Sequence, residues 1–231
     1  MKKILAIGAH PDDVEFGAAG LLIKEIALGA KVKIVITSLG EAGSNGTQEG
    51  RKKEAQAAAK LIGAEFEYIP MGGDCHIEDV PKNRIIIAEL IRTWKPNIVL
   101  APSLTENQHP DHLAVAQMAR AAARLARYGG LKELKKLATH SIDALYNYPS
   151  SAEFDRRADI VIDVSEHYEK WVAAMELHKS QMKTRGYINL VGSKAKYLGA
   201  TIGVEYAVAL WVNDPVTIDS ITELGSSRKY K

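Results

Sequence analysis

The chain alternates short apolar runs with longer amphipathic segments, and this alternation constrains its fold more than any other feature. The short runs are rich in β-branched residues and bounded by breakers, which is typical of buried strands: 4–9, 32–37, 66–70 and 98–101. The longer segments carry apolar residues at helical spacing and end near Gly or Pro: 17–28, 51–62, 83–94 and 112–128. We therefore predict an α/β fold, with a mostly parallel sheet and helices on both faces.

The second half of the chain is less regular. Residues 144–148 and 159–164 indicate two further strands and 166–182 a helix, whereas 203–212 fit either a strand or a helix. The 231 residues contain no internal repeat, and this length suits one domain. We expect residues 1–231 to form a single domain, with a core over 1–150 and a C-terminal extension of the same domain over 151–231.

Composition excludes several classes of function. Thirty basic and 28 acidic residues give a net charge of +2, too balanced to predict binding to nucleic acid or to an anionic membrane. Cys75 is the one cysteine, which rules out an intrachain disulfide and Cys₄ or Cys₂His₂ zinc sites. The apolar run at 4–9 is too short for a signal peptide, and no run approaches the ~20 apolar residues of a transmembrane helix. We expect a cytoplasmic protein.

A first polar cluster follows the first predicted strand. It contains His10, Asp12 and Asp13, and ligands of open α/β sheets bind beyond the carboxyl ends of the strands. Imidazole nitrogen and carboxylate oxygen suit zinc or another divalent first-row metal. A helix start would explain acidic residues here, Glu15 above all, because carboxylates cap helix N-termini and complement the helix dipole. It does not explain His10 and both aspartates together.

A second polar cluster, His109 to His112, follows the strand at 98–101 and opens a helix. His109 fits the N-cap position and Pro110 the first helical position. In the Rossmann-like strand order 3-2-1-4-5, strands one and four are neighbours at the topological switch point. A His/Asp pair from the first cluster and a His from the second can therefore meet on one ion. Three protein ligands with an open position describe a catalytic zinc site.

The two clusters carry a resemblance to a known family. The segments AHPDDVE at 9–15 and HPDH at 109–112 resemble the paired signatures of the LmbE/PIG-L-type zinc-dependent N-deacetylases. Within that family the chain is most similar to bacillithiol-biosynthesis deacetylases acting on N-acetylglucosaminyl malate. The resemblance runs along nearly the whole chain. Asn107 and Gln108 depart from it, since many bacillithiol-group relatives carry Asp-Arg there, and this leaves the particular substrate open.

The resemblance implies roles that spacing alone does not assign. His10, Asp13 and His112 match the metal ligands, Asp12 the general base, and His109 the residue that stabilises the tetrahedral intermediate. Arg51 matches an arginine near the substrate pocket; a pair with Glu54 on the same helix is the alternative. The implied cofactor is Zn²⁺, or Fe²⁺ in the cell. The implied substrate is a small amino sugar, and family members often assemble as trimers or hexamers.

Other interpretations stay open at this point. A metal-dependent hydrolase of another small amide fits the same residues. A non-catalytic nucleotide-binding module fits the sheet, but no G-x-G-x-x-G follows the first strand. Either Asp12 or His109 is placed to protonate the leaving amine. Tyr146, Tyr148 and His178 fit packing or substrate contact, while Cys75 and His76 follow the third strand without forming a motif.

Overall fold

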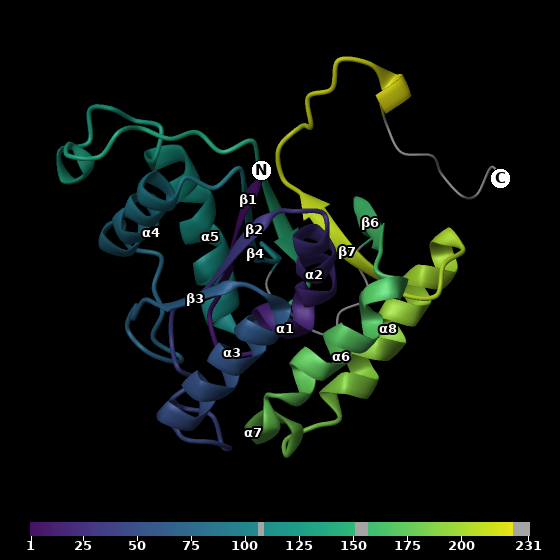
Figure 1. Ribbon diagram of the computed structural model, residues 1–231. Coiled ribbons are helices and arrows are strands. Elements are labelled where there is room, and N and C mark those ends of the chain that lie inside the picture. The colour runs from purple at the N-terminus through teal and green to yellow at the C-terminus, as the bar shows by residue number, and fades with distance from the viewer. Residues whose placement is uncertain (106–108, 151–156, 224–231) are drawn as a thin grey trace.

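The computed structural model describes residues 1–105, 109–150 and 157–223; Asn107 and Gln108 lie outside these ranges. Its centre is a seven-stranded sheet with the order β3-β2-β1-β4-β5-β7-β6 (Figure 1). The strands are β1 (Lys3–Gly8), β2 (Lys31–Ile36), β3 (Glu65–Tyr68), β4 (Ile98–Pro102), β5 (Ala144–Tyr148), β6 (Ile160–Asp163) and β7 (Ala207–Val212). Strands β1 to β5 are parallel, β7 is antiparallel to β5, and β6 to β7. The predicted α/β fold with a mostly parallel sheet is confirmed.

The position of β1 in the sheet determines where the two polar clusters lie. β1 pairs with β2 on one side and with β4 on the other, with Ala6 opposite Leu100. The chain leaves β1 toward one side of the sheet and β4 toward the other, which makes this pair the topological switch point. The segments that follow β1 and β4 therefore emerge side by side.

The helices largely follow the predicted pattern, with differences in the second half. They are α1 (Asp13–Gly17), α2 (Ala19–Ala27), α3 (Gln48–Ile62), α4 (Pro81–Trp94), α5 (Pro110–Leu125), α6 (Tyr168–Glu176), α7 (Lys179–Met182) and α8 (Tyr187–Ile202). The predicted helix at 166–182 is interrupted, because the backbone of His178 (φ −81°, ψ 57°) leaves the helical region. Helix α8 was not predicted, and the undecided segment 203–212 contains β7.

Local signals set several helix ends. The Thr47 side chain accepts a hydrogen bond from the Gly50 amide, as an N-cap does, and Gly63 ends α3 at φ 100°. His109 is the N-cap of α5, where its side chain accepts from the Asp111 amide, and Pro110 follows at the first helical position. The second polar cluster is thus the capped start of a helix.

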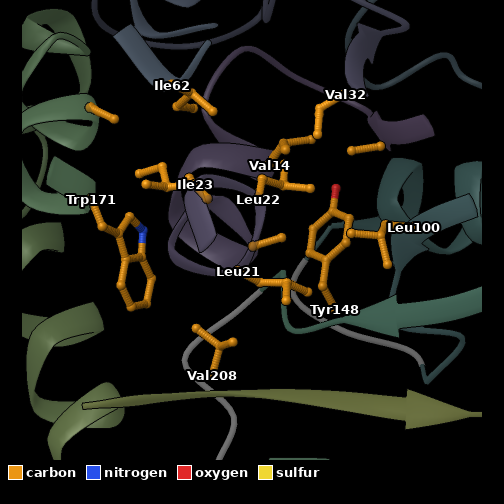
Figure 2. Close-up of a cluster of buried hydrophobic side chains, with 14 of the residues drawn as sticks. Val14, Leu21, Leu22, Ile23, Val32, Ile62, Leu100, Tyr148, Trp171 and Val208 are labelled. Atoms are coloured by element: carbon orange, nitrogen blue, oxygen red, sulfur yellow. The ribbon is translucent and has the colours of Figure 1, made fainter. Parts of the chain in front are cut away.

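Two apolar clusters cover the two faces of the sheet. One contains residues of α4 and α5; the other contains residues of α2, α3, α6 and α8, and Figure 1 shows the two groups of helices on either side. Figure 2 shows Trp171 and Tyr148 on opposite sides of α2, in the apolar cluster that contains residues of α2. The Trp171 indole donates to the Glu15 carbonyl (2.7 Å), and the Tyr148 hydroxyl donates to the Ile7 carbonyl (2.8 Å). Both bonds anchor the segment around the first polar cluster.

Among the helices of the described ranges, none is both long and apolar enough to cross a membrane.

Candidate metal centre

The structure brings the three predicted metal ligands together at the carboxyl ends of β1 and β4. The His10 Nδ1 atom lies 3.2 Å from His112 Nε2, and Asp13 Oδ1 lies 3.0 Å from the same His112 atom. All three residues are buried, and each offers a ligand atom within 4.8 Å of the others. Two imidazoles and one carboxylate at such separations form a donor set that fits a divalent first-row metal ion.

Asp13 is fixed by the turn that follows β1. Its Oδ2 atom accepts hydrogen bonds from the amides of Ala9 (2.8 Å) and His10 (2.9 Å), which leaves Oδ1 directed at His112. Burial alone would raise the pKa of Asp13, but the neighbouring His112 and His10 outweigh it and hold the pKa well below its usual range. The carboxylate is therefore ionised, as a metal ligand must be.

Two further carboxylates orient His10. Its Nε2 atom lies 3.1 Å from Asp74 Oδ1 and 3.2 Å from Asp111 Oδ2. Burial would lower the pKa of His10, yet hydrogen bonds to Asp111, Asp13 and Asp74 raise it well above its usual value. A metal ion that binds Nδ1 displaces the proton there, while the Nε2–H stays directed at the carboxylates, the arrangement usual around metal-bound histidines. Sequence reasoning missed both carboxylates, although Asp111 lies within HPDH and Asp74 follows β3 at the same sheet edge.

Asp12 lies beside this cluster in an unusual backbone conformation. Its φ of 116° is rare outside glycine, and such strain concentrates at functional sites. Its side chain makes no helix-capping hydrogen bond, so the helix-start interpretation does not account for it. Burial and the charge of Asp13 raise the pKa of Asp12 to about 6, against the opposing effect of Arg51. A carboxylate with this pKa accepts protons more readily than an ordinary aspartate.

His109 faces the same cluster from the start of α5. Its Nδ1 atom accepts from the Asp111 amide (3.3 Å), so the proton of the neutral ring lies on Nε2. Burial, together with the nearby His10, lowers the pKa of His109. The Nε2 atom lies 3.5 Å from Asp74 Oδ1. His109 is thus a neutral imidazole whose Nε2–H donates.

Arg51 reaches the site from α3 and joins two loops. Its Nη1 donates to the Gly40 carbonyl (2.8 Å) and its Nη2 to the Pro11 carbonyl (3.2 Å), and Nη2 lies 3.6 Å from Asp12 Oδ2. Its Nε is buried and has no hydrogen-bond partner among the described residues. Glu54, the alternative partner of Arg51 in the sequence analysis, accepts hydrogen bonds from the Ser180 amide (2.9 Å) and hydroxyl (2.6 Å).

A cavity of about 370 Å³ opens above these groups. His10, Asp12, Asp13, Arg51, Asp74, His109 and His112 line its polar end. Phe16, Trp171, Leu190 and Val191 form an apolar wall, and Arg185 and Lys194 add cationic side chains. Much of the apolar wall belongs to α8.

Three other candidates lie outside the cavity lining. Tyr148 is fully buried in the core, and Tyr146 belongs to β5 and lines a separate hollow. His178 is buried, with its Nε2 atom 3.7 Å from Glu15 Oε1. Burial would lower the pKa of His178, but the charge of Glu15 outweighs burial and raises it above the usual value. The geometry favours packing roles for all three.

A cavity at the switch point of a mostly parallel sheet, with a His/Asp/His donor set at its polar end, defines a Rossmann-like α/β protein with a candidate metal centre. Residues 5–123 match the family model described as PIG-L, GlcNAc-PI de-N-acetylase. The chain belongs to the PIG-L family.

Three curated relatives show which enzymes the chain is similar to. The chain is 28% identical over 196 residues to diacetylchitobiose deacetylase of Thermococcus kodakarensis, covering 78% of this chain and 70% of the relative. It is 26% identical over 218 residues to the probable N-acetyl-alpha-D-glucosaminyl L-malate deacetylase 2 of Bacillus subtilis, covering 84% and 89%. It is also 24% identical over 192 residues to 4-oxalmesaconate hydratase of Pseudomonas putida, covering 78% and 74%.

The crystal structure of the conserved protein TT1542 from Thermus thermophilus superposes with a TM-score of 0.84 at 28% identity, covering 98% of this chain and all of that one. The similarity in fold therefore extends over nearly the whole chain.

Proposed function

We propose that the protein is a metal-dependent N-deacetylase that hydrolyses the acetamido group of an N-acetylglucosamine derivative. The observation that carries the proposal is the convergence of His10, Asp13 and His112 beside Asp12 and His109 at the polar end of one cavity. Membership of the PIG-L family and the two deacetylase relatives support the same reaction. N-acetylglucosaminyl malate is the substrate we would test first.

In the proposed reaction, His10, Asp13 and His112 would hold a zinc or ferrous ion, which would supply Lewis-acid chemistry and lower the pKa of the attacking water. Asp12 accepts the proton that the water loses as its oxygen attacks the acetyl carbon. His109 donates its Nε2–H to the oxyanion of the tetrahedral intermediate. The amide C–N bond then breaks, and the leaving amine takes the proton that Asp12 accepted from the water.

The rest of the cavity suits a sugar that carries an anionic group. Arg51 lines the same cavity, with its Nη2 atom 3.6 Å from Asp12 Oδ2, and we assign its guanidinium to binding the substrate. Arg185 and Lys194 line the same cavity and would attract a carboxylate such as that of malate. The apolar wall offers a surface for a sugar ring.

We further propose that residues 1–231 act as one domain in a homo-oligomer, a trimer or hexamer.

A second candidate is the addition of water to a carbon–carbon double bond. It is favoured by the similarity to 4-oxalmesaconate hydratase. Asp12 as base and His109 as hydrogen-bond donor would serve that reaction equally well, because both reactions begin with activation of water.

One set of assays separates the candidates. Acetate release is measured from N-acetylglucosaminyl malate, N-acetylglucosamine and short chito-oligosaccharides, with and without a chelator, and 4-oxalmesaconate consumption is measured in parallel. We expect acetate release that the chelator abolishes and added zinc or iron restores. Turnover of 4-oxalmesaconate with no acetate from any amino sugar would refute the deacetylase and support the hydratase.

A further inference from the structure

Next to the candidate metal centre, three side chains form a second cluster of donor atoms. The Cys75 Sγ atom lies 3.6 Å from Asp74 Oδ1 and 3.8 Å from His109 Nε2. The His109 Nε2 atom lies 3.5 Å from Asp74 Oδ1, which closes the triangle. None of these three residues is among the ligands assigned to the first ion.

The size of this triangle matches a tetrahedral metal site. Ligands at about 2.0–2.3 Å from zinc lie roughly 3.3–3.8 Å from one another when the geometry is tetrahedral. One sulfur, one nitrogen and one oxygen also form the mixed donor set that zinc and cobalt accept and that magnesium and calcium avoid. The three atoms therefore need little movement to bind an ion of this class.

The loop after β3 holds the triangle in place. Gly72 and Gly73 adopt positive φ values of 109° and 97°, and a Cβ on Gly72 would lie 2.5 Å from the His76 carbonyl oxygen. The Asp74 Oδ2 atom accepts from the Ala42 amide (3.1 Å), which turns Oδ1 toward both His10 Nε2 (3.1 Å) and the triangle. The Cys75 amide donates to Asp111 Oδ2 (2.8 Å) and so fixes the backbone from which Sγ projects.

The surroundings favour a cation and allow it to enter. Asp74 and Asp111 are both buried, and together with His10 and His109 they form a group that could hold an ion. Cys75 is exposed and His109 is half-buried, so an ion can arrive from solvent. On binding, the Cys75 thiol gives up its proton to solvent, because the thiolate is the ligand.

We propose that Asp74, Cys75 and His109 form a second site for a zinc-like divalent cation, and that an ion bound there inhibits the enzyme. An ion at this site binds the Nε2 atom of His109, whose proton moves to Nδ1 in place of the hydrogen bond from the Asp111 amide. The ring then has no Nε2 proton to donate to the oxyanion. The inhibitory part rests on the proposed function, whereas the site itself does not. The enzyme would thus be active with one ion per chain and inhibited by excess metal.

Cobalt binding tests the site without any enzyme assay. Co²⁺ is titrated into the metal-free full-length chain while the near-ultraviolet thiolate-to-cobalt charge-transfer band and the stoichiometry are recorded. We expect two ions per chain, with the band growing during the second equivalent. In Cys75→Ser the band should disappear and the second ion should bind about 10-fold or more weakly. One ion per chain, or no thiolate band, would overturn the site.

Two further variants complete the cobalt test. Cys75→Gly takes the positive φ of 66° without cost and should behave like Cys75→Ser, which separates ligand loss from any effect on folding. His76→Ala removes the adjacent exposed imidazole and should keep both the band and the second ion.

Zinc titration of the activity then tests inhibition. The wild-type enzyme should lose activity beyond the first zinc equivalent, and Cys75→Ser should need about 10-fold or more zinc for the same loss. Activity at one equivalent should be unchanged, since Cys75 has no part in the proposed reaction. Equal zinc sensitivity in the two proteins would refute the inhibitory role. If no acetate is released at all, the proposed function fails while the cobalt result still decides the site.

Discussion

Replacing Asp12 by Asn tests the proposed general base with little disturbance of the fold. Asn has the same shape as Asp, and both tolerate positive φ better than other non-glycine residues, which matters at φ 116°. Asp12 also lies outside the His10, Asp13 and His112 set, so bound metal should be retained. An alanine at this position would add backbone strain and confuse the result.

The expected loss of activity follows from the role assigned to Asp12. A positioned general base contributes roughly 10²–10⁴-fold to the rate, which corresponds to about 3–5 kcal/mol of transition-state stabilisation. Asp12→Asn should lower kcat by that factor. In the wild type, activity should fall as the pH drops below about 6, the value to which burial and Asp13 raise the pKa of Asp12, because the protonated carboxyl cannot accept a proton.

The same substitution should stabilise the metal-free protein at neutral and alkaline pH. Because the folded state raises the Asp12 pKa from 3.8 to about 6, its contribution to stability is fully present below the unfolded pKa. That contribution is lost as the pH rises through about 6. The shift of about two units corresponds to about 3 kcal/mol, and each kcal/mol moves the melting temperature of a chain this size by about 2–4 °C. Asn carries no such penalty.

The assay is acetate release combined with metal analysis and thermal melts at pH 4 and pH 8. Asp12→Asn should keep its ion at the first site and turn over slowly, and its metal-free form should melt above the metal-free wild type at pH 8 but not at pH 4. Asp143→Asn is the matched control. Asp143 is exposed, pairs with Lys2, and precedes the amino-terminal end of β5, whereas the candidate site lies at the carboxyl ends of the parallel strands. Full kcat in Asp12→Asn would refute the general-base assignment, and an unchanged melt at pH 8 would refute the electrostatic argument.

Three further substitutions test the other assignments. His112→Ala removes one of three ligands and should abolish stoichiometric metal and acetate release; one tightly bound ion per chain at the first site would contradict the ligand set. Arg51→Lys cannot reproduce the planar guanidinium and should raise KM more than it lowers kcat, whereas an unchanged KM would rule out substrate contact. Tyr148→Phe removes the bond to the Ile7 carbonyl and should cost about 1 kcal/mol of unfolding free energy with unchanged kcat and KM; a large kcat loss would place the phenol in the reaction.

The fold was largely predictable because its signals are local. Runs of β-branched residues fixed β1, β2 and β4 to within a residue or two, since a strand buried on both faces must be apolar throughout. Helix α8 escaped prediction because its small residues, Gly192 and Gly199 among them, weaken the helical signal. It is stabilised as a helix by packing against the apolar cluster that contains Trp171.

The candidate site was predictable to the extent that it follows strand ends. His10 to Asp13 and His109 to His112 come directly after strands that are neighbours in the sheet, so their convergence follows from topology. Asp74 belongs to a loop whose shape depends on positive φ at Gly72 and Gly73, and the sequence pattern does not encode that shape. Its contact with His10 therefore became visible only in three dimensions.

The amino-acid sequence by itself determined the alternation of strands and helices and the two polar clusters that meet at the ends of β1 and β4. Both follow from local properties of the chain, namely the spacing of its apolar residues and the order of its strands. The tertiary structure alone decided which carboxylates orient His10, which nitrogen of His109 carries the proton, and that Cys75 lies beside it. The tertiary structure also placed α8 as the apolar wall of the cavity. These features depend on distances between segments remote in sequence, which are set by packing and by loop conformation rather than by any local preference of the chain.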